Sequence, residues 1–144
     1  MSRAIIAIAL LLTTLTARAE QYVEQDGFRV HYAALPTTDL QPEVAKRFGV
    51  SRSSRRILLV LNAQRVLADG QTQSVAATGN GNASSLLGHV QKLRLRSERE
   101  ADVHYLLAQL QALDGEYLNF DLSVTPEGTQ RPIGIRFQQQ FYLD

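Results

Sequence analysis

The stretch YLNFDLSVT, residues 117–125, alternates between apolar and polar side chains without a break. Leu118, Phe120, Leu122 and Val124 fall on one side, and the polar residues between them fall on the other. A period of two is that of a β-strand, in which successive side chains point to opposite faces of the sheet. The stretch therefore predicts a half-buried strand, and its apolar face requires a second layer of structure to cover it.

Neighbouring segments extend the same pattern. After the turn residues Pro126 to Gly128, a second alternating run over 133–142 predicts a hairpin with the first strand. Residues 57–61 are apolar on both faces, which is typical of a strand inside the structure. The complete set of predicted strands is 22–24, 28–34, 57–64, 73–78, 90–96, 103–110, 117–125 and 133–142.

The fold that this pattern predicts is mainly β: an antiparallel β-sandwich, immunoglobulin-like in architecture, of seven or eight strands. A closed barrel is the alternative, since it also buries one face of each strand. One short helix is expected over 42–48. Pro42 suits a first helical turn and Gly49 supplies the stop. Glu43 and Arg47 match the helix dipole at its two ends.

Two segments have mixed signals. Residues 103–113 place leucines at helical spacing but begin with the β-formers Val103, His104 and Tyr105, so strand is favoured for the first half and helix stays open. The segment Gly79-Asn80-Gly81-Asn82 predicts a tight turn, because glycine and asparagine tolerate positive φ. Such a turn would end a hairpin or lead into one helical turn over 84–87.

The first nineteen residues follow the plan of a secretory signal peptide. Arg3 precedes an apolar run from Ala4 to Leu12, and Ala17-Arg18-Ala19 fits the small-x-small motif of a signal peptidase site. We expect cleavage after Ala19, and we expect residues 20–144 to form a single β-sandwich domain. The apolar run is shorter than the roughly 20 residues of a membrane span, and no later stretch is a better candidate. The chain has no cysteine, which excludes disulfides and thiolate metal sites.

The net charge of the chain is close to zero, at +1 with neutral histidines. Because nucleic-acid binding needs a basic face, it is not expected here. Positive charge is nonetheless concentrated between residues 46 and 65. Arg47, Arg52, Arg55 and Arg56 form the candidate binding surface, since a guanidinium group suits phosphate or carboxylate ligands. The alternative is a solvated segment with no ligand.

Catalytic or metal chemistry has little support in the sequence. His31, His89 and His104 are the set that could hold a metal, but no His-x-His or Glu-x-x-His spacing joins them. On strands, His31 would lie outward and His104 would share a partly covered face with Leu106. No Gly-x-Ser-x-Gly motif exposes a serine nucleophile. We therefore predict no catalytic residues, no metal site and no cofactor.

Several blocks follow one another in a specific order: FRVHY at 28–32, PEVAK at 42–46, LLGHV at 86–90, FDLSVTP at 120–126 and FQQQFY at 137–142. In this order they resemble a bacterial family of small exported proteins known as a domain of unknown function. The LLGHV block is similar to the family's central Asn-Leu-Leu-Gly-Gln block, with Ser85 and His89 in place of the usual amides. The resemblance implies a Gram-negative source, a periplasmic location and a β-sandwich-like fold. It brings no activity, cofactor or catalytic residue with it.

Three functions are consistent with these observations. The first is a periplasmic binding or accessory module that presents the arginine segment to an envelope protein or an anionic envelope component. The second is a hydrolytic or metal-dependent enzyme that uses His31 or His104 with an acidic partner. The third is a structural scaffold in an oligomer, which a large exposed apolar patch or an unpaired edge strand would indicate. The lack of catalytic groupings favours the first.

Overall fold

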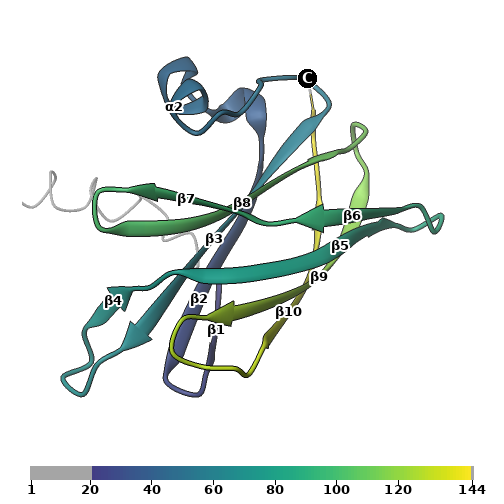
Figure 1. The fold of residues 1–144 in the computed structure, drawn as a ribbon. Helices are drawn as coiled ribbons and strands as arrows, with labels where there is room; N and C mark the ends of the chain where they lie inside the picture. Colours follow the sequence, from purple (N-terminus) through teal and green to yellow (C-terminus); the bar gives the residue numbers. More distant parts are fainter. Residues whose placement is uncertain (1–20, 144) are drawn as a thin grey trace, which may run out of the picture.

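The structure is a computed structural model that describes residues 21–143, so the predicted signal peptide and its cleavage site lie outside the described residues. These residues form two antiparallel sheets packed face to face, as Figure 1 shows. The predicted antiparallel β-sandwich is therefore confirmed, and the closed-barrel alternative is wrong because backbone pairing divides the strands between two sheets. The strands are β1 (Tyr22–Gln25), β2 (Phe28–Pro36), β3 (Arg56–Val66), β4 (Thr72–Ser74), β5 (Ala77–Ser85), β6 (Val90–Arg94), β7 (Arg96–Glu100), β8 (Val103–Gln111), β9 (Tyr117–Pro126) and β10 (Ile133–Gln140).

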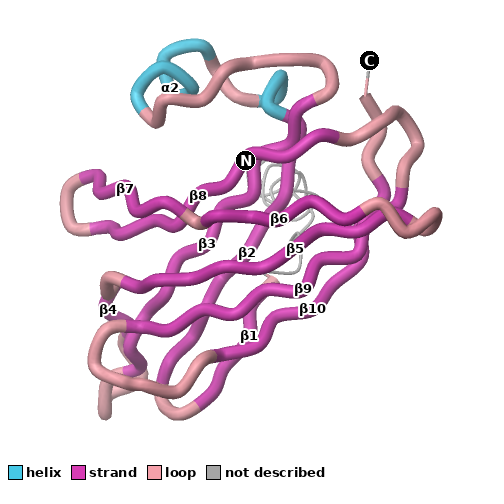
Figure 2. Tube along the Cα trace, turned by 45° about the vertical axis from the view of Figure 1, so that its right-hand side comes forward, coloured by secondary structure: helices cyan, strands magenta, loops and turns pink. Residues whose placement is uncertain are grey.

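The first sheet has the order β1-β2-β3-β8-β7, with β4 paired to the end of β3. The second sheet has the order β10-β9-β5-β6 (Figure 2). The predicted hairpin of β9 and β10 is present, with Phe137 opposite Phe120. At the open side of the sandwich, the Gln139 side chain donates a hydrogen bond of 2.8 Å to the Ala34 carbonyl oxygen, which ties β10 to β2.

Two continuous runs of chain pass from one sheet to the other. The predicted strand 90–96 is divided at Leu95, because β6 pairs with β5 in the second sheet and β7 pairs with β8 in the first. The predicted strand 73–78 is divided in the same way at Val75 and Ala76, between β4 and β5. Strands that switch sheets are the corners of a sandwich. They explain why ten strands form where seven or eight are predicted.

The predicted turn at Gly79-Asn80-Gly81-Asn82 is wrong, since these residues lie in the middle of β5. Their glycines serve close packing. A Cβ atom on Gly79 would lie 2.8 Å from the Leu95 side chain, and one on Gly81 would lie 2.4 Å from the Asp121 carbonyl oxygen. A glycine inside a strand often marks such a close approach of another segment. The helical turn over 84–87 is also absent, because β5 extends to Ser85 and residues 86–88 form a turn.

The segment 103–113 is a strand, β8, along nearly its whole length. Its leucines occur at helical spacing because both faces of the strand are covered. Leu106 and Leu110 lie in the core between the sheets, whereas Leu107 lies in a second apolar cluster on the outer face of the first sheet. The helical alternative is therefore excluded.

The main core lies between the two sheets, as the alternation in β9 predicts. Leu118, Phe120, Leu122 and Val124 are each no more than 2% exposed. Phe120 stacks on Phe137, with ring centroids 4.5 Å apart. Burial of these side chains supplies the main driving force for packing the two sheets together.

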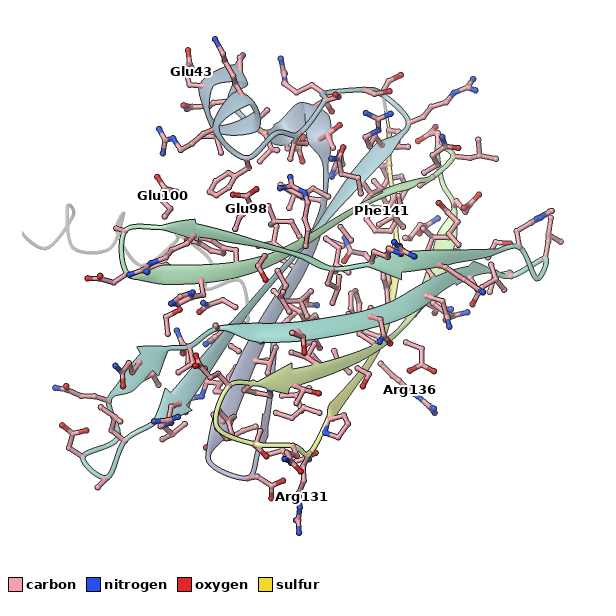
Figure 3. The ribbon with its side chains drawn as sticks, viewed as in Figure 1. Glu43, Glu98, Glu100, Arg131, Arg136 and Phe141 are labelled. Atoms are coloured by element: carbon pink, nitrogen blue, oxygen red, sulfur yellow. The ribbon has the colours of Figure 1, made fainter. Side chains whose placement is uncertain are left out.

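A helical segment covers the outer face of the first sheet. It contains a 3-10 turn, η1 (Thr37–Asp39), and the predicted short helix, α2 (Pro42–Arg47). Ala45 of the helix packs with Val50, Leu58 and Leu107. Figure 3 shows Glu98 and Glu100 pointing from β7 toward α2. No helix among the described residues has the length and apolar character needed to cross a membrane.

Candidate functional site

A pocket of about 610 Å³ lies at the end of the sandwich where the β5–β6 turn meets the β8–β9 connection. One wall consists of Leu86, Leu87 and His89 from the turn. A second wall comes from residues 111–113 and 115–118, and Arg55, just before β3, lies in the lining with Ser85 and Gln91. Volumes of this order are typical of sites for small molecules.

The rim of the pocket is apolar and exposed. Leu87 is 89% exposed, Leu86 is 66% exposed and Leu113 is 58% exposed. Tyr117, at the start of β9, also lines the pocket and is 41% exposed. A single exposed leucine needs no explanation, but several around one concave site indicate a surface for binding.

Local hydrogen bonds fix the turn that carries the two leucines. The Ser85 amide donates to the His89 carbonyl oxygen at 2.9 Å, and the His89 amide donates to the Ser85 hydroxyl at 3.1 Å. Gly88 closes the turn with a φ of +88°, a conformation that side chains disfavour. These bonds hold Leu86 and Leu87 at the tip, outside both sheets.

Two glutamines of the pocket lining are hydrogen-bonded to each other. The Gln91 side chain donates to the Gln111 carbonyl oxygen at 2.8 Å and accepts from the Gln111 amide at 2.9 Å. This pairing joins β6 of the second sheet to β8 of the first. The charged residues in the lining are Arg55 and Glu116, one of each sign.

The structure separates the four arginines of the predicted binding surface. Arg55 lines the pocket, whereas the guanidinium groups of the other three have partners elsewhere. These partners are Glu100 for Arg47, the Thr38 carbonyl oxygen at 3.0 Å for Arg52, and the Ser51 carbonyl oxygen at 3.5 Å for Arg56. A binding role for the whole set stays a prediction, and the geometry singles out Arg55.

The three histidines lie on separate elements. His31, on the outer face of β2, is half-buried and lies 3.1 Å from the Gln64 side-chain oxygen, not beside a carboxylate. His104 lies on β8 and is half-buried, whereas His89 lies in the exposed β5–β6 turn. Within residues 21–143, no group of three His, Cys, Asp or Glu side chains could hold a metal ion.

The outer face of the second sheet carries a shallower polar depression. Asp121 on β9 pairs with Arg136 on β10 at 3.4 Å, and Gln138 donates to the Asn119 side chain at 3.0 Å. Asp121 thus lies outward, where its strand pattern places it. Figure 3 shows Arg136 reaching away from the sheet toward solvent.

The sequence did not predict the pocket, because its walls come from three separate parts of the chain. One signal was available: two consecutive leucines followed by glycine, in the only block with LLG, occupy a turn where polar residues are usual. Their exposure could not be inferred while 84–87 was open to a helical interpretation.

Comparison with known proteins gives three results. The family model for a domain of unknown function, DUF4426, matches residues 22–144. The crystal structure of a DUF4426 family protein from Pseudomonas aeruginosa PAO1 is similar, with 27% identity and a TM-score of 0.74, covering 90% of this chain and 99% of that one. A search of curated proteins found no match.

More distant similarity extends to FetP of uropathogenic Escherichia coli strain F11, recombinantly expressed in the periplasm. Its structure as isolated has 11% identity and a TM-score of 0.61, covering 87% of this chain and 95% of FetP. A copper-bound FetP variant has 10% identity and the same TM-score, covering 87% of this chain and 96% of the variant. Similarity at this level shows a shared fold and nothing about ligands.

Proposed function

The chain belongs to the DUF4426 family, and from this premise we propose that it is a periplasmic binding module whose site is the pocket beside Leu87. The observation that carries the proposal is the combination of exposed leucines and a guanidinium group around one concavity. Apolar groups on the rim gain free energy when a partner removes them from water. A cation at the same place gives the site a preference for anionic groups.

The pocket walls are suited to binding rather than to chemistry. Its titratable lining residues are Arg55, His89, Glu116 and Tyr117. No hydrogen bond within residues 21–143 joins the His89 ring to a carboxylate or hydroxyl group in this lining, so the base-and-nucleophile pairing of hydrolases has no counterpart there. The ligand is an envelope protein or an anionic envelope component.

The periplasmic location rests on the signal-like residues 1–19 and on the family resemblance. FetP, which shares the fold, was expressed in the periplasm. Intact-mass measurement of the protein from a periplasmic fraction tests the location: the mass should correspond to a chain that begins at Glu20. A full-length mass, or recovery in the cytoplasmic fraction, would contradict it.

Site-directed crosslinking in cells tests the binding role. A photoreactive residue in place of Leu87 should give crosslinks to one partner or ligand that are lost when Arg55 is replaced by alanine. The matched control is the same photoreactive residue at Leu67, an exposed leucine in the β3–β4 turn outside the pocket lining. Equal products from both positions would refute the site. Crosslinks solely between copies of the chain would favour the scaffold alternative instead.

A further inference from the structure

The apolar part of the pocket continues from the rim toward the core. Leu86, Leu87 and Leu113 are exposed at the mouth, whereas Ala112 and Leu118, which also line the pocket, are 3% and 1% exposed. An apolar ligand that enters the pocket therefore meets aliphatic side chains from the solvent edge to the interior. Such a lining suits an apolar chain better than a sugar, whose hydroxyl groups would lie unpaired against aliphatic side chains.

The cationic side chain in the polar part of the pocket is that of Arg55. No side-chain hydrogen bond or ion pair of Arg55 is formed within the described residues, although Arg47 and Arg52 both have partners there. A guanidinium group binds a carboxylate through two parallel hydrogen bonds. Glu116, the acidic residue in the lining, disfavours a ligand with several negative charges.

We propose that the pocket binds single-chain amphipathic anions of the fatty-acid type, with the carboxylate on Arg55 and the alkyl chain along the leucines. The inference rests on the proposed function and names the ligand class for the same site. The volume of about 610 Å³ accommodates one alkyl chain of moderate length but no folded partner. A bilayer surface is a poorer match, because the leucines surround a concavity and Glu116 would face anionic lipid headgroups.

Isothermal titration calorimetry with short soluble probes, each below its micelle concentration, tests the ligand class. Hexanoate, octanoate and decanoate should bind with affinity that rises about tenfold for each added pair of methylene groups. Nonyltrimethylammonium, which has the same alkyl chain as decanoate and the opposite charge, should bind at least about tenfold more weakly than decanoate. Equal binding of decanoate and its cationic counterpart, or no binding of decanoate, would refute the ligand class.

Four variants connect the affinity to the site. Arg55→Gln should weaken decanoate binding by about tenfold or more, whereas Arg52→Gln should leave it unchanged. Leu87→Asp should abolish measurable binding, whereas Leu67→Asp, an exposed leucine outside the pocket, should not. All four positions are exposed, so circular dichroism should show folded protein in each case. A decanoate affinity that Arg55→Gln leaves unchanged would overturn the assignment of the carboxylate.

A last comparison separates this inference from the proposed function. Flotation with phosphatidylglycerol vesicles should leave the protein unbound; vesicle binding with no affinity for decanoate would replace the free anion by a membrane surface as the ligand. If Leu87 crosslinks to an envelope protein while decanoate does not bind, the binding module stands and the fatty-acid ligand is refuted. If neither occurs, both proposals fail.

Discussion

The Thr37 hydroxyl group forms two hydrogen bonds with the backbone of Ser53, donating to the carbonyl oxygen at 3.0 Å and accepting from the amide at 2.9 Å. Thr37 is fully buried, with 0% exposure. These two hydrogen bonds join the beginning and the end of the segment that contains η1 and α2. They thereby hold this segment against the outer face of the first sheet. Arg55 follows Ser53 by two residues, so the same pair positions the backbone that carries the pocket's cation.

Replacing Thr37 by valine keeps the shape of the side chain but removes both hydrogen bonds. The Ser53 amide and carbonyl groups would remain without this partner, so we expect a loss of about 2 kcal/mol in the free energy of unfolding. Urea denaturation followed by circular dichroism measures it. Thr38→Val, at the exposed neighbouring position, is the control and should change stability by less than about 0.5 kcal/mol. Similar losses at both positions would contradict the role of the pair.

Two glycines of the second sheet, Gly81 on β5 and Gly134 on β10, should respond very differently to an added methyl group. In Gly81→Ala, the new Cβ would lie 2.4 Å from the Asp121 carbonyl oxygen, so we expect destabilisation of about 2–3 kcal/mol. In Gly134→Ala, on β10, the new Cβ meets no atom within 4 Å. Thermal unfolding should therefore show a clear decrease in the midpoint temperature for Gly81→Ala and no decrease for Gly134→Ala. A tolerated Gly81→Ala would show that β5 and β9 are less closely packed than described.

The β7–β8 turn offers a stabilising substitution. Ala101 has a φ of +51°, in the left-handed region that costs an L-residue about 1–2 kcal/mol relative to glycine. Glycine loses part of this advantage through its larger entropy in the unfolded chain. Ala101→Gly should therefore raise the free energy of unfolding by about 0.5–1 kcal/mol, as measured by denaturant titration. A decrease in stability would show that the turn relaxes to negative φ in solution.

Two arginines near α2 should differ in importance. The Arg96 side chain, half-buried, contacts both Glu98 and the Phe48 carbonyl oxygen at the end of the helix. Arg47 forms an exposed ion pair with Glu100, and such pairs contribute at most about 1 kcal/mol. We expect Arg96→Gln to destabilise the protein by about 1–2 kcal/mol and Arg47→Gln by under about 0.5 kcal/mol. In 0.5 M salt, the small effect of Arg47→Gln should disappear, whereas that of Arg96→Gln should largely persist.

Titration with copper tests whether this chain differs in metal binding from FetP, which shares its fold. A copper-bound form is known for a FetP variant, but His31, His89 and His104 lie on separate elements in this chain. Calorimetric titration with Cu²⁺ or Zn²⁺ at micromolar protein should give no binding isotherm. A saturating isotherm that His31→Gln abolishes would show that the described side chains rearrange around a metal.

The periodicity of the sequence predicted the fold because each sheet turns one apolar face toward the core that the two sheets share. The run 117–125 could be assigned without ambiguity, since its four apolar side chains point into one core. Strand was favoured for 103–113, but its leucines left helix open because Leu106 and Leu107 belong to two different apolar clusters on opposite faces of β8. A single sequence does not reveal that a strand is covered on both sides by different elements.

The errors at Gly79 and Gly81 have another origin. Glycine permits a turn, and it also permits close approach of a neighbouring segment, and the local sequence does not separate these uses. The contacts that decide between them come from Leu95 and Asp121, which are distant in sequence. The pocket was missed for the same reason, since Arg55 meets the turn of Leu86 and Leu87 only after the chain has folded.

The passage of the chain between sheets at Leu95 constrains how the pocket adapts to a ligand. The two sheets are joined covalently where β6 continues into β7, and they are joined beside the pocket by the two hydrogen bonds between the Gln91 side chain and the Gln111 backbone, so opening the sheets at the pocket would break both of these bonds. The pocket would therefore adjust to ligands of different length through changes in the rotamers of Leu86 and Leu87, which lie on the β5–β6 turn. The Gln91–Gln111 link thus holds the two sheets at a fixed distance, whereas the exposed Leu86 and Leu87 side chains at the mouth can change rotamer. This combination would admit a homologous series of ligands.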